Sequence, residues 1–311
     1  LRTVIADLFT PLIELLVQPG EKPLQAKFSL YDAARLYLKT CYSAKEIENI
    51  PTSAEWLLDG NGPAVASRDP FRISIDKFAY EISRRTATDI SDLPIHLKIA
   101  PLLFLKDILH EDANNSKRVA SFFSKTGMPR YLTELLNDIE IDWDLLSRKD
   151  ADHTLRHKLF TTLILTLVRL SLTVPGWNAL AELALPEVLS HLTALKNPPK
   201  QIFIQPATVN TKDTPSFLFA NSVDLVMHLC LTLCAKPKWK RISLKILDVV
   251  HSHGEMLSQL MRAEIHCHAV ETASNLVQQI FNDDEVTRPV IEKEAVLRLL
   301  NKRKSDIIRL P

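Results

Sequence analysis

Apolar residues recur every three or four positions along almost the whole chain, which is the spacing of one face of an α-helix. In residues 1–17, for example, Leu8, Leu12 and Leu15 share an apolar stripe, and the run stops at Pro19. Capping residues and prolines divide the rest of the chain into similar segments. The predicted helices cover 1–17, 29–42, 43–50, 74–86, 94–111, 116–126, 129–138, 153–173, 177–184, 186–196, 216–235, 238–252, 255–281 and 291–303.

Two stretches interrupt this pattern. Residues 59–73 include Asp59-Gly60-Asn61-Gly62-Pro63, whose residue types are typical of turns. Residues 197–215 contain an apolar stretch at 201–205 that leaves two interpretations open, a single extended strand or a loop that packs over a groove. Both stretches are predicted to be loops between helices.

Two of the predicted helices are apolar on nearly every side. Residues 155–172 and 217–234 place leucine and other large apolar residues around the whole circumference. Such helices have to lie between neighbours, because no side of them prefers water. Their alternation with one-stripe helices is typical of a solenoid. We predict an all-α fold, an irregular HEAT/ARM-like α-solenoid of stacked antiparallel helices, with 1–311 as one segment. No fixed repeat period supports tetratricopeptide or ankyrin arrays.

Composition excludes several classes of function. The chain has 38 Lys+Arg against 37 Asp+Glu, a net charge of +1. Because nucleic-acid binding draws its affinity from a surplus of cations, we expect no nucleic-acid partner. The chain has 6 glycines in 311 residues, well below the average of roughly 7%. This scarcity disfavours Rossmann, P-loop and β-sandwich designs, which need positive-φ positions.

The start of the chain and its longest apolar run bear on location. The first residue is Leu1, and it opens an amphipathic run without the pattern of a signal peptide. We therefore expect the sequence to be a piece of a longer chain. The longest apolar run, 159–174, is shorter than a membrane span and contains Arg169. We expect no membrane insertion.

Candidate nucleophiles and acid–base groups show no catalytic pattern. No G-x-S-x-G, HExxH or GxxxxGK[ST] motif occurs, and paired carboxylates such as Asp142 and Asp144 lie in polar connectors. The cysteines form no CxxC pair, so reduced core thiols are predicted. They are Cys41, Cys230, Cys234 and Cys267. We predict no enzyme activity, no cofactor and no metal.

Histidines cluster in the C-terminal half of the chain. His251 and His253 lie about 200° apart around a helix, and so do His266 and His268. Neither pair can chelate a metal from one helical face. Helix-end capping and interhelical hydrogen bonds are the predicted roles.

Residues 126–195 carry a more specific pattern. They begin TGMPRYLTELLNDIEIDWDLL, continue through a long buried helix, and then read VPGWNALAELALPEVLSHL. This stretch resembles the C-terminal region of the very large α-solenoid scaffold nucleoporins of the inner ring of the nuclear pore complex. The matching residues are Gly127, Leu132 and Leu136 in the first helix, Leu163, Leu167 and Leu170 in the buried helix, and Gly176, Ala179, Leu180, Leu189 and Leu192 beyond it.

The resemblance extends over residues 90–280. Residues 225–231 and 246–253 look like the family's next helix pair, which ends in a terminal His. The chain departs from the family pattern at Leu185-Pro186, where a glycine is expected.

The resemblance implies that the sequence is a C-terminal part of a much longer chain, with a structural role at the nuclear envelope. Such a chain contributes to the inner ring and offers grooves to scaffold and linker nucleoporins, whose short amphipathic helices fill apolar grooves without any cofactor. The sequence leaves an alternative open, a helical-repeat adaptor or scaffold of a trafficking coat, a signalling complex or a transport receptor, because the same physics builds all of them.

The C-terminal helices are the predicted site for a partner. The ranges 255–281 and 291–303 carry mixed faces and would offer apolar surface if nothing stacks on them. The predicted partner-binding residues are Met256, Leu260, Val270, Leu276 and Ile280.

Overall fold

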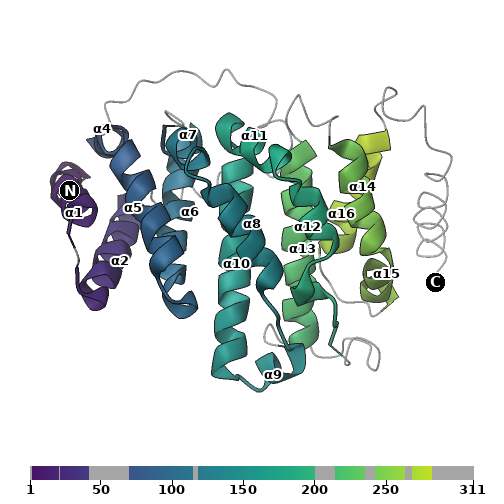
Figure 1. Ribbon diagram of the computed structural model, residues 1–311. Coiled ribbons are helices and arrows are strands. Elements are labelled where there is room, and N and C mark those ends of the chain that lie inside the picture. Colours follow the sequence, from purple (N-terminus) through teal and green to yellow (C-terminus); the bar gives the residue numbers. More distant parts are fainter. Residues whose placement is uncertain are drawn as a thin grey trace. The chain divides into compact units, whose positions relative to one another are not determined.

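The computed structural model describes residues 2–20, 22–41, 70–114, 118–199, 214–234, 242–262 and 268–281 (Figure 1). These residues form α-helices and short 3-10 helices and contain no β-strand, which confirms the all-α prediction. The chain divides into two compact units, and each is described by itself. Unit 1 comprises residues 1–139 and 151–183, and unit 2 comprises residues 140–150 and 184–311.

Unit 1 contains the helices of residues 1–139 and, after residues 140–150, which belong to unit 2, two further helices in residues 151–183. Its elements are α1 (Arg2–Val17), α2 (Leu24–Cys41), α4 (Pro70–Lys77), α5 (Ala79–Asp92), η2 (Ile95–Leu97), α6 (Ile99–Asn114), α7 (Arg118–Ser124), α8 (Met128–Asp138), α10 (Ala151–Ser171) and α11 (Val174–Glu182).

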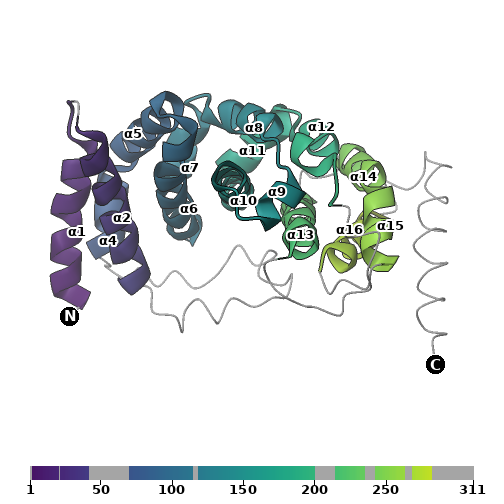
Figure 2. The same ribbon diagram turned by 90° about the horizontal axis from the view of Figure 1, so that it is seen from below.

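The helices of unit 1 pack against near neighbours in the chain. Helix α1 packs on α2 and α4, α5 packs on α7, and α2 packs on α6 (Figures 1 and 2). Aromatic rings join α2 to α6, because Tyr31 and Phe104 lie with ring centroids 5.3 Å apart. The Ser83 hydroxyl of α5 lies within hydrogen-bonding distance of the Val119 carbonyl of α7, at 3.1 Å. Both apolar burial and satisfied polar groups therefore hold these pairs together.

Helix α10 is the central helix of the later part of unit 1. It packs against α6, α8 and α11. Phe160, Leu163, Leu167 and Leu170 are fully buried in α10. The sequence prediction that this helix lies between neighbours is confirmed.

A sharp corner joins α10 to α11, with a bend of 115° between them. The Thr173 hydroxyl caps α11 by accepting a hydrogen bond from the Gly176 backbone N–H at 3.1 Å. Gly176 lies directly against Leu170, since a Cβ built on Gly176 would meet the Leu170 carbonyl oxygen at 2.2 Å. Trp177, the next residue, is buried. The corner therefore requires a residue without a side chain at position 176.

Unit 2 contains the C-terminal helices and one short helix that precedes α10 in the chain. Its elements are α9 (Trp143–Ser147), α12 (Leu185–Ser190), η3 (Thr193–Leu195), α13 (Pro215–Cys234), α14 (Ser243–Ser252), α15 (Gly254–Arg262) and α16 (Ala269–Phe281).

Helix α13 is the centre of unit 2. It packs on α16, α9 and α14, and α12 packs on α14. Trp143 of α9 is almost fully buried, with its ring edge-on to Phe219 of α13 at 5.0 Å. The Trp143 indole N–H donates to the Ala194 carbonyl of η3 at 3.0 Å. A short helix and a 3-10 turn are thereby fixed to the central helix.

Several boundaries differ from the predicted ones. The predicted helix 74–86 is two helices, α4 and α5, divided at Phe78, although helical hydrogen bonds continue across it from Phe78 N to Ser74 O (3.1 Å) and from Ile82 N to Phe78 O (2.8 Å). Residues 70–73, predicted to be loop, belong to α4. The predicted helix 255–281 is present as α15 and α16.

One helix was not predicted, and some predictions lie outside the described residues. Helix α9 forms because the Asp142 side chain caps it, accepting from the N–H groups of Asp144 (2.9 Å) and Leu145 (3.0 Å). The predicted helices 43–50 and 291–303, the turn residues 59–63 and the apolar stretch 201–205 lie outside the described part of the chain.

The α10–α11 corner yields a first prediction. Gly176→Ala is expected to destabilise the chain by about 1–3 kcal/mol, because the new methyl group meets a backbone oxygen that cannot swing away. Urea unfolding measures the change.

Gly254→Ala is the matched control for this substitution. A Cβ at Gly254 meets nothing within 4 Å, and the residue is the first of α15. This substitution is expected to stabilise by about 0.4–1 kcal/mol. Equal effects of the two substitutions would contradict the close approach at Gly176.

Candidate functional site

Four of the predicted partner-binding residues lie in the core of unit 2. The exposed fractions of Met256, Leu260, Leu276 and Ile280 are 8%, 1%, 0% and 0%, while Val270 is half-buried. Helices α15 and α16 cover these side chains by packing on each other and on α14, and α16 also packs on α13. The exposure on which the prediction depended is therefore not found at these four positions. Binding of a partner by the C-terminal helices stays a prediction.

Three polar side chains form a small cluster where α13 meets α16. The Thr272 hydroxyl of α16 donates to Asp224 Oδ1 of α13 at 3.2 Å. His228 Nδ1 lies 3.2 Å from the same carboxylate oxygen. The hydrogen bond with Asp224 raises the pKa of His228, against the opposing effect of partial burial. This group ties the two helices together at the edge of the core.

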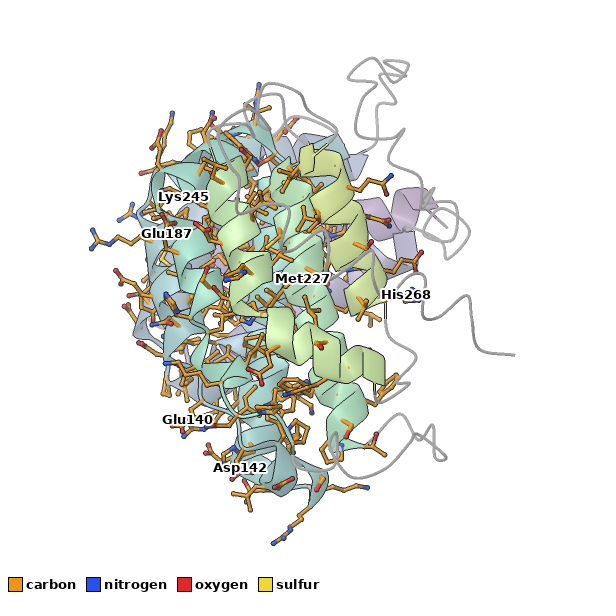
Figure 3. All side chains as sticks on the ribbon, turned by 90° about the vertical axis from the view of Figure 1, so that its right-hand side faces the viewer. Glu140, Asp142, Glu187, Met227, Lys245 and His268 are labelled. Carbon is orange, nitrogen blue, oxygen red and sulfur yellow. The ribbon has the colours of Figure 1, made fainter. Side chains whose placement is uncertain are left out.

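The histidines at the end of α14 are on different faces, as predicted. His251 is exposed, whereas His253 is buried. The His253 ring is hydrogen-bonded through Nε2 to the Leu189 carbonyl of α12 at 2.7 Å, an interhelical contact of the kind predicted. His268 is exposed at the start of α16 beside Glu271 (Figure 3). His266 lies outside the described residues.

His253 gives unit 2 a dependence on pH. Burial lowers the pKa of His253, and the positive charge of His191 adds to this effect, whereas the hydrogen bond to Leu189 opposes it. The folded state therefore binds a proton less readily than the unfolded state, whose histidine pKa is about 6.5. The contribution of His253 to stability is present above that pH and is lost as the pH falls through the lowered pKa.

Hydrogen exchange measures this effect on α14 and α15. Protection of residues 243–262, corrected for the intrinsic exchange rate, is expected to fall between pH 7.5 and pH 5. His253→Gln keeps a donor for the Leu189 carbonyl and cannot titrate, so its protection is expected to change less. An equal loss of protection in both proteins would assign the pH dependence to another group.

Two cysteines of α13 are core thiols, as predicted. Cys230 and Cys234 are free and buried. Burial raises the pKa of the Cys230 thiol to about 12. Burial, together with the neighbouring Cys230, raises the pKa of the Cys234 thiol even further. Neither thiol is a thiolate at neutral pH, so neither is a nucleophile in the folded unit.

A buried ionic cluster in unit 1 was missed by the sequence analysis. Asp89 of α5 is buried and accepts hydrogen bonds from Lys27 Nζ (2.9 Å), the Tyr31 hydroxyl (2.8 Å) and Arg85 Nε (3.1 Å). Burial, with the charge and hydrogen bond of Asp89, raises the pKa of Tyr31 well above its usual value. The tyrosine therefore remains a neutral donor. The partners of Asp89 on α2 are about 60 positions away in sequence, so no local pattern indicates them.

Replacing the carboxylate of this cluster is expected to destabilise unit 1. Asp89→Ala leaves two cations without their buried partner, and the loss expected is about 3–5 kcal/mol. Glu134→Ala in α8 is the control, because Glu134 also pairs with an arginine four residues away, Arg130, but at the surface, with both side chains more than half exposed. The control is expected to lose less than about 1 kcal/mol in urea unfolding.

A second buried charge closes the end of α5. Lys98 is buried, and its ammonium group donates to the carbonyl oxygens of Ile90 and Ser91 at the C-terminus of α5. The same group lies over the Tyr131 ring of α8, 5.2 Å from its centroid. A cation at this end of a helix is favoured by the helix dipole. Lys98 therefore acts as a structural cap within unit 1.

Several large apolar side chains of unit 1 are exposed and are not covered by the other described helices of the unit. On α1, Leu8 and Leu15 lie one heptad apart and are 52% and 48% exposed. Leu24 and Leu36 of α2 are also exposed. The opposite side of α1 buries Phe9 and Ile13. Helix α1 is therefore apolar both toward its neighbours and toward the surface.

One described helix, α13, is long and apolar enough to cross a membrane. By the same test α10 and α11 together would pass as a bent pair. In the structure α13 is the central helix of unit 2, and 56% of its apolar window is buried inside the chain. Core helices and membrane spans share this composition, and the prediction of no membrane insertion stays a prediction.

No metal site is evident in the described part of the chain. Within these ranges no three His, Cys, Asp or Glu side chains are grouped so as to hold an ion. Asp142, one of the carboxylates weighed as an acid–base group, caps α9. What the described side chains offer is packing surface and ionic contacts between helices. Glu187 of α12 and Lys245 of α14 are an exposed example (Figure 3).

Comparison with known proteins gives no match. No protein-family model, no curated protein and no solved structure matches the chain.

Proposed function

We propose that the chain is a structural scaffold segment of the inner ring of the nuclear pore complex, at the nuclear envelope. It is an irregular HEAT/ARM-like solenoid that binds linker and scaffold nucleoporins through grooves between its helices and so supports nucleocytoplasmic transport. The observation that carries this proposal is that the residues that resemble the family have structural roles. They lie in the core, form the corner between α10 and α11, or make contacts between helices.

The first part of the resemblance forms the turn into α8. Gly127 precedes the helix with a φ of 74°, a conformation that glycine adopts without strain. Leu132 and Leu136 of α8 are fully buried. A glycine and two leucines at this spacing thus serve a turn followed by a packed helix.

The second part forms the α10–α11 corner. Leu163, Leu167 and Leu170 are fully buried, and Gly176 touches Leu170 so closely that no side chain fits. Glycine is therefore required at position 176 by the close contact between the two helices at the corner. This requirement accounts for the glycine in the family-like sequence more specifically than helical periodicity does.

The later parts of the resemblance meet within unit 2. Leu189 and Leu192 are buried. His253, the terminal His of the downstream helix pair, is bonded to the Leu189 carbonyl. Two residues 64 positions apart, each in a segment that resembles the family, are therefore in direct contact. A shared scaffold would explain why both segments carry their pattern.

A scaffold also fits the surface. The exposed leucines of α1 and α2 offer the kind of apolar surface that an amphipathic partner helix covers with anchors at i, i+3, i+4 and i+7. With a net charge of +1, apolar anchoring is expected to contribute more to affinity than long-range attraction. No step of this function requires a cofactor.

Affinity purification of the tagged full-length parent at physiological salt, with cross-links mapped by mass spectrometry, tests the proposal. Cross-links from residues 90–303 to linker or scaffold nucleoporins are expected. Coat, signalling or transport-receptor proteins in their place would overturn the pore assignment and favour the alternative adaptor role.

Point variants at the surface test the mode of binding. Leu8→Glu and Leu15→Glu change exposed side chains, so the fold is expected to stay intact, as circular dichroism would show. Ile13→Glu in the same helix changes a fully buried side chain and is expected to unfold unit 1. If the surface pair leaves all captured partners unchanged, then α1 is not part of the binding surface.

A further inference from the structure

The ionic cluster around Asp89 contains more positive charge than one carboxylate neutralises. Lys27 bonds to one oxygen of Asp89, and Arg85 bonds to the other. Both cations keep only 17% of their side-chain surface exposed, and Asp89 keeps 2%. The Tyr31 hydroxyl adds a neutral donor. The group therefore has a net charge of +1 in a place where water screens it poorly.

A third cation, Lys22, lies close enough to this group to interact with its charges. It precedes α2, and its ammonium group donates to the Gln18 carbonyl at 2.9 Å. Partial burial and the positive charges of Arg85 and Lys27 lower the pKa of Lys22, while Asp89 alone acts in the opposite direction. With Lys22 the group has three cations and one anion, a net charge of +2.

One donor of the cluster has no acceptor. The Nη2 atom of Arg85 is buried and makes no hydrogen bond with the described residues. A guanidinium group presents its donors as a flat fork that matches the oxygens of a carboxylate or a phosphate. Since the Nε of Arg85 is already bonded to Asp89, the guanidinium is held in place with donors to spare. An unpaired buried charged donor is costly unless a ligand completes it.

We propose that the cluster of Lys22, Lys27 and Arg85 is an oxyanion site, which takes a carboxylate or a phosphate between the ammonium groups and the free edge of the Arg85 guanidinium. Figures 1 and 2 show α2 and α5, which carry Lys27 and Arg85, at the same end of unit 1. Asp89 positions the two cations and is not itself a ligand. The proposal is independent of the pore assignment, because it depends on this cluster alone.

Two sources would supply such a group. One is a glutamate or aspartate of a partner peptide, and the other is free phosphate. Titration of the full 311-residue chain, isotopically labelled at arginine, distinguishes them. The Arg85 Nε–H signal is assigned from its absence in Arg85→Lys. Inorganic phosphate and an acetylated tetraglutamate peptide are added separately, each exchanged against chloride at constant ionic strength.

A saturable shift of the Arg85 signal with either probe is expected. Lys22→Gln is expected to weaken binding about tenfold, the ratio that corresponds to about 1.4 kcal/mol. Among the described residues Lys22 donates to one backbone carbonyl, at the surface, so this variant is expected to fold normally. Arg130→Gln removes a surface arginine with the same i,i+4 pairing and is expected to leave binding unchanged.

The pattern of responses identifies the source. A shift with the peptide at lower concentration than with phosphate assigns a partner carboxylate, and the reverse assigns phosphate. No saturable shift with either probe overturns the proposal. A shift that Lys22→Gln and Arg130→Gln reduce equally also overturns it, because general attraction by positive charge would then explain the binding.

Discussion

Each unit depends on one helix that is apolar on nearly every side. Such a helix is stable only when other helices remove it from water, since burial of a large apolar side chain contributes about 1.5–3 kcal/mol. Helix α10 has this role in the later part of unit 1, where it packs on α6, α8 and α11, and α13 has it in unit 2. The surrounding helices need only one apolar stripe each.

Some buried hydroxyls form hydrogen bonds within their own helix. The hydroxyls of Thr162 and Thr166 donate to carbonyl oxygens one turn earlier in α10, at 2.7 Å each. Helix α10 thus satisfies these two interior threonines largely within itself, and Thr166 also reaches the Leu102 carbonyl of α6 at 3.5 Å. The charged groups follow a different rule, because Lys98 and Asp89 bind groups on other turns or other helices. Charged groups connect elements in this way, and so do some hydroxyls, such as Ser83 of α5 and Thr272 of α16.

The sequence predicts the helices better than it predicts what they contact. The burial of Leu163 and Leu167 follows from apolar residues on all sides of one helix, which is local information. The corner at Gly176 is marked by its proline and glycine, but the contact with Leu170 is seen only in three dimensions. Helices α15 and α16 come from a run that has no proline and no glycine after Gly254, so composition does not mark them as two elements.

The candidate sites show the same division. Met256 and Leu276 were assigned to a surface because a mixed helical face looks alike whether another helix covers it or a partner does. Helix α14 packs on α15 and α16, and α13 packs on α16. Both α13 and α14 lie apart from α16 in the chain. The Asp89 cluster joins residues of α2 and α5 by long-range contacts, and ordinary lysines and arginines in a balanced composition give no sign of it. Predicting such sites requires knowledge of which helices are neighbours.

The two buried thiols of α13 have a practical consequence. Because Cys230 and Cys234 are inaccessible and protonated in the folded unit, a thiol reagent reacts with them only during the moments when unit 2 opens. At high reagent concentration the rate of modification equals the rate of opening. At low reagent concentration it is proportional to the equilibrium population of the open form. The two cysteines of the central helix are therefore natural probes, and their modification reports how often unit 2 opens without any added label.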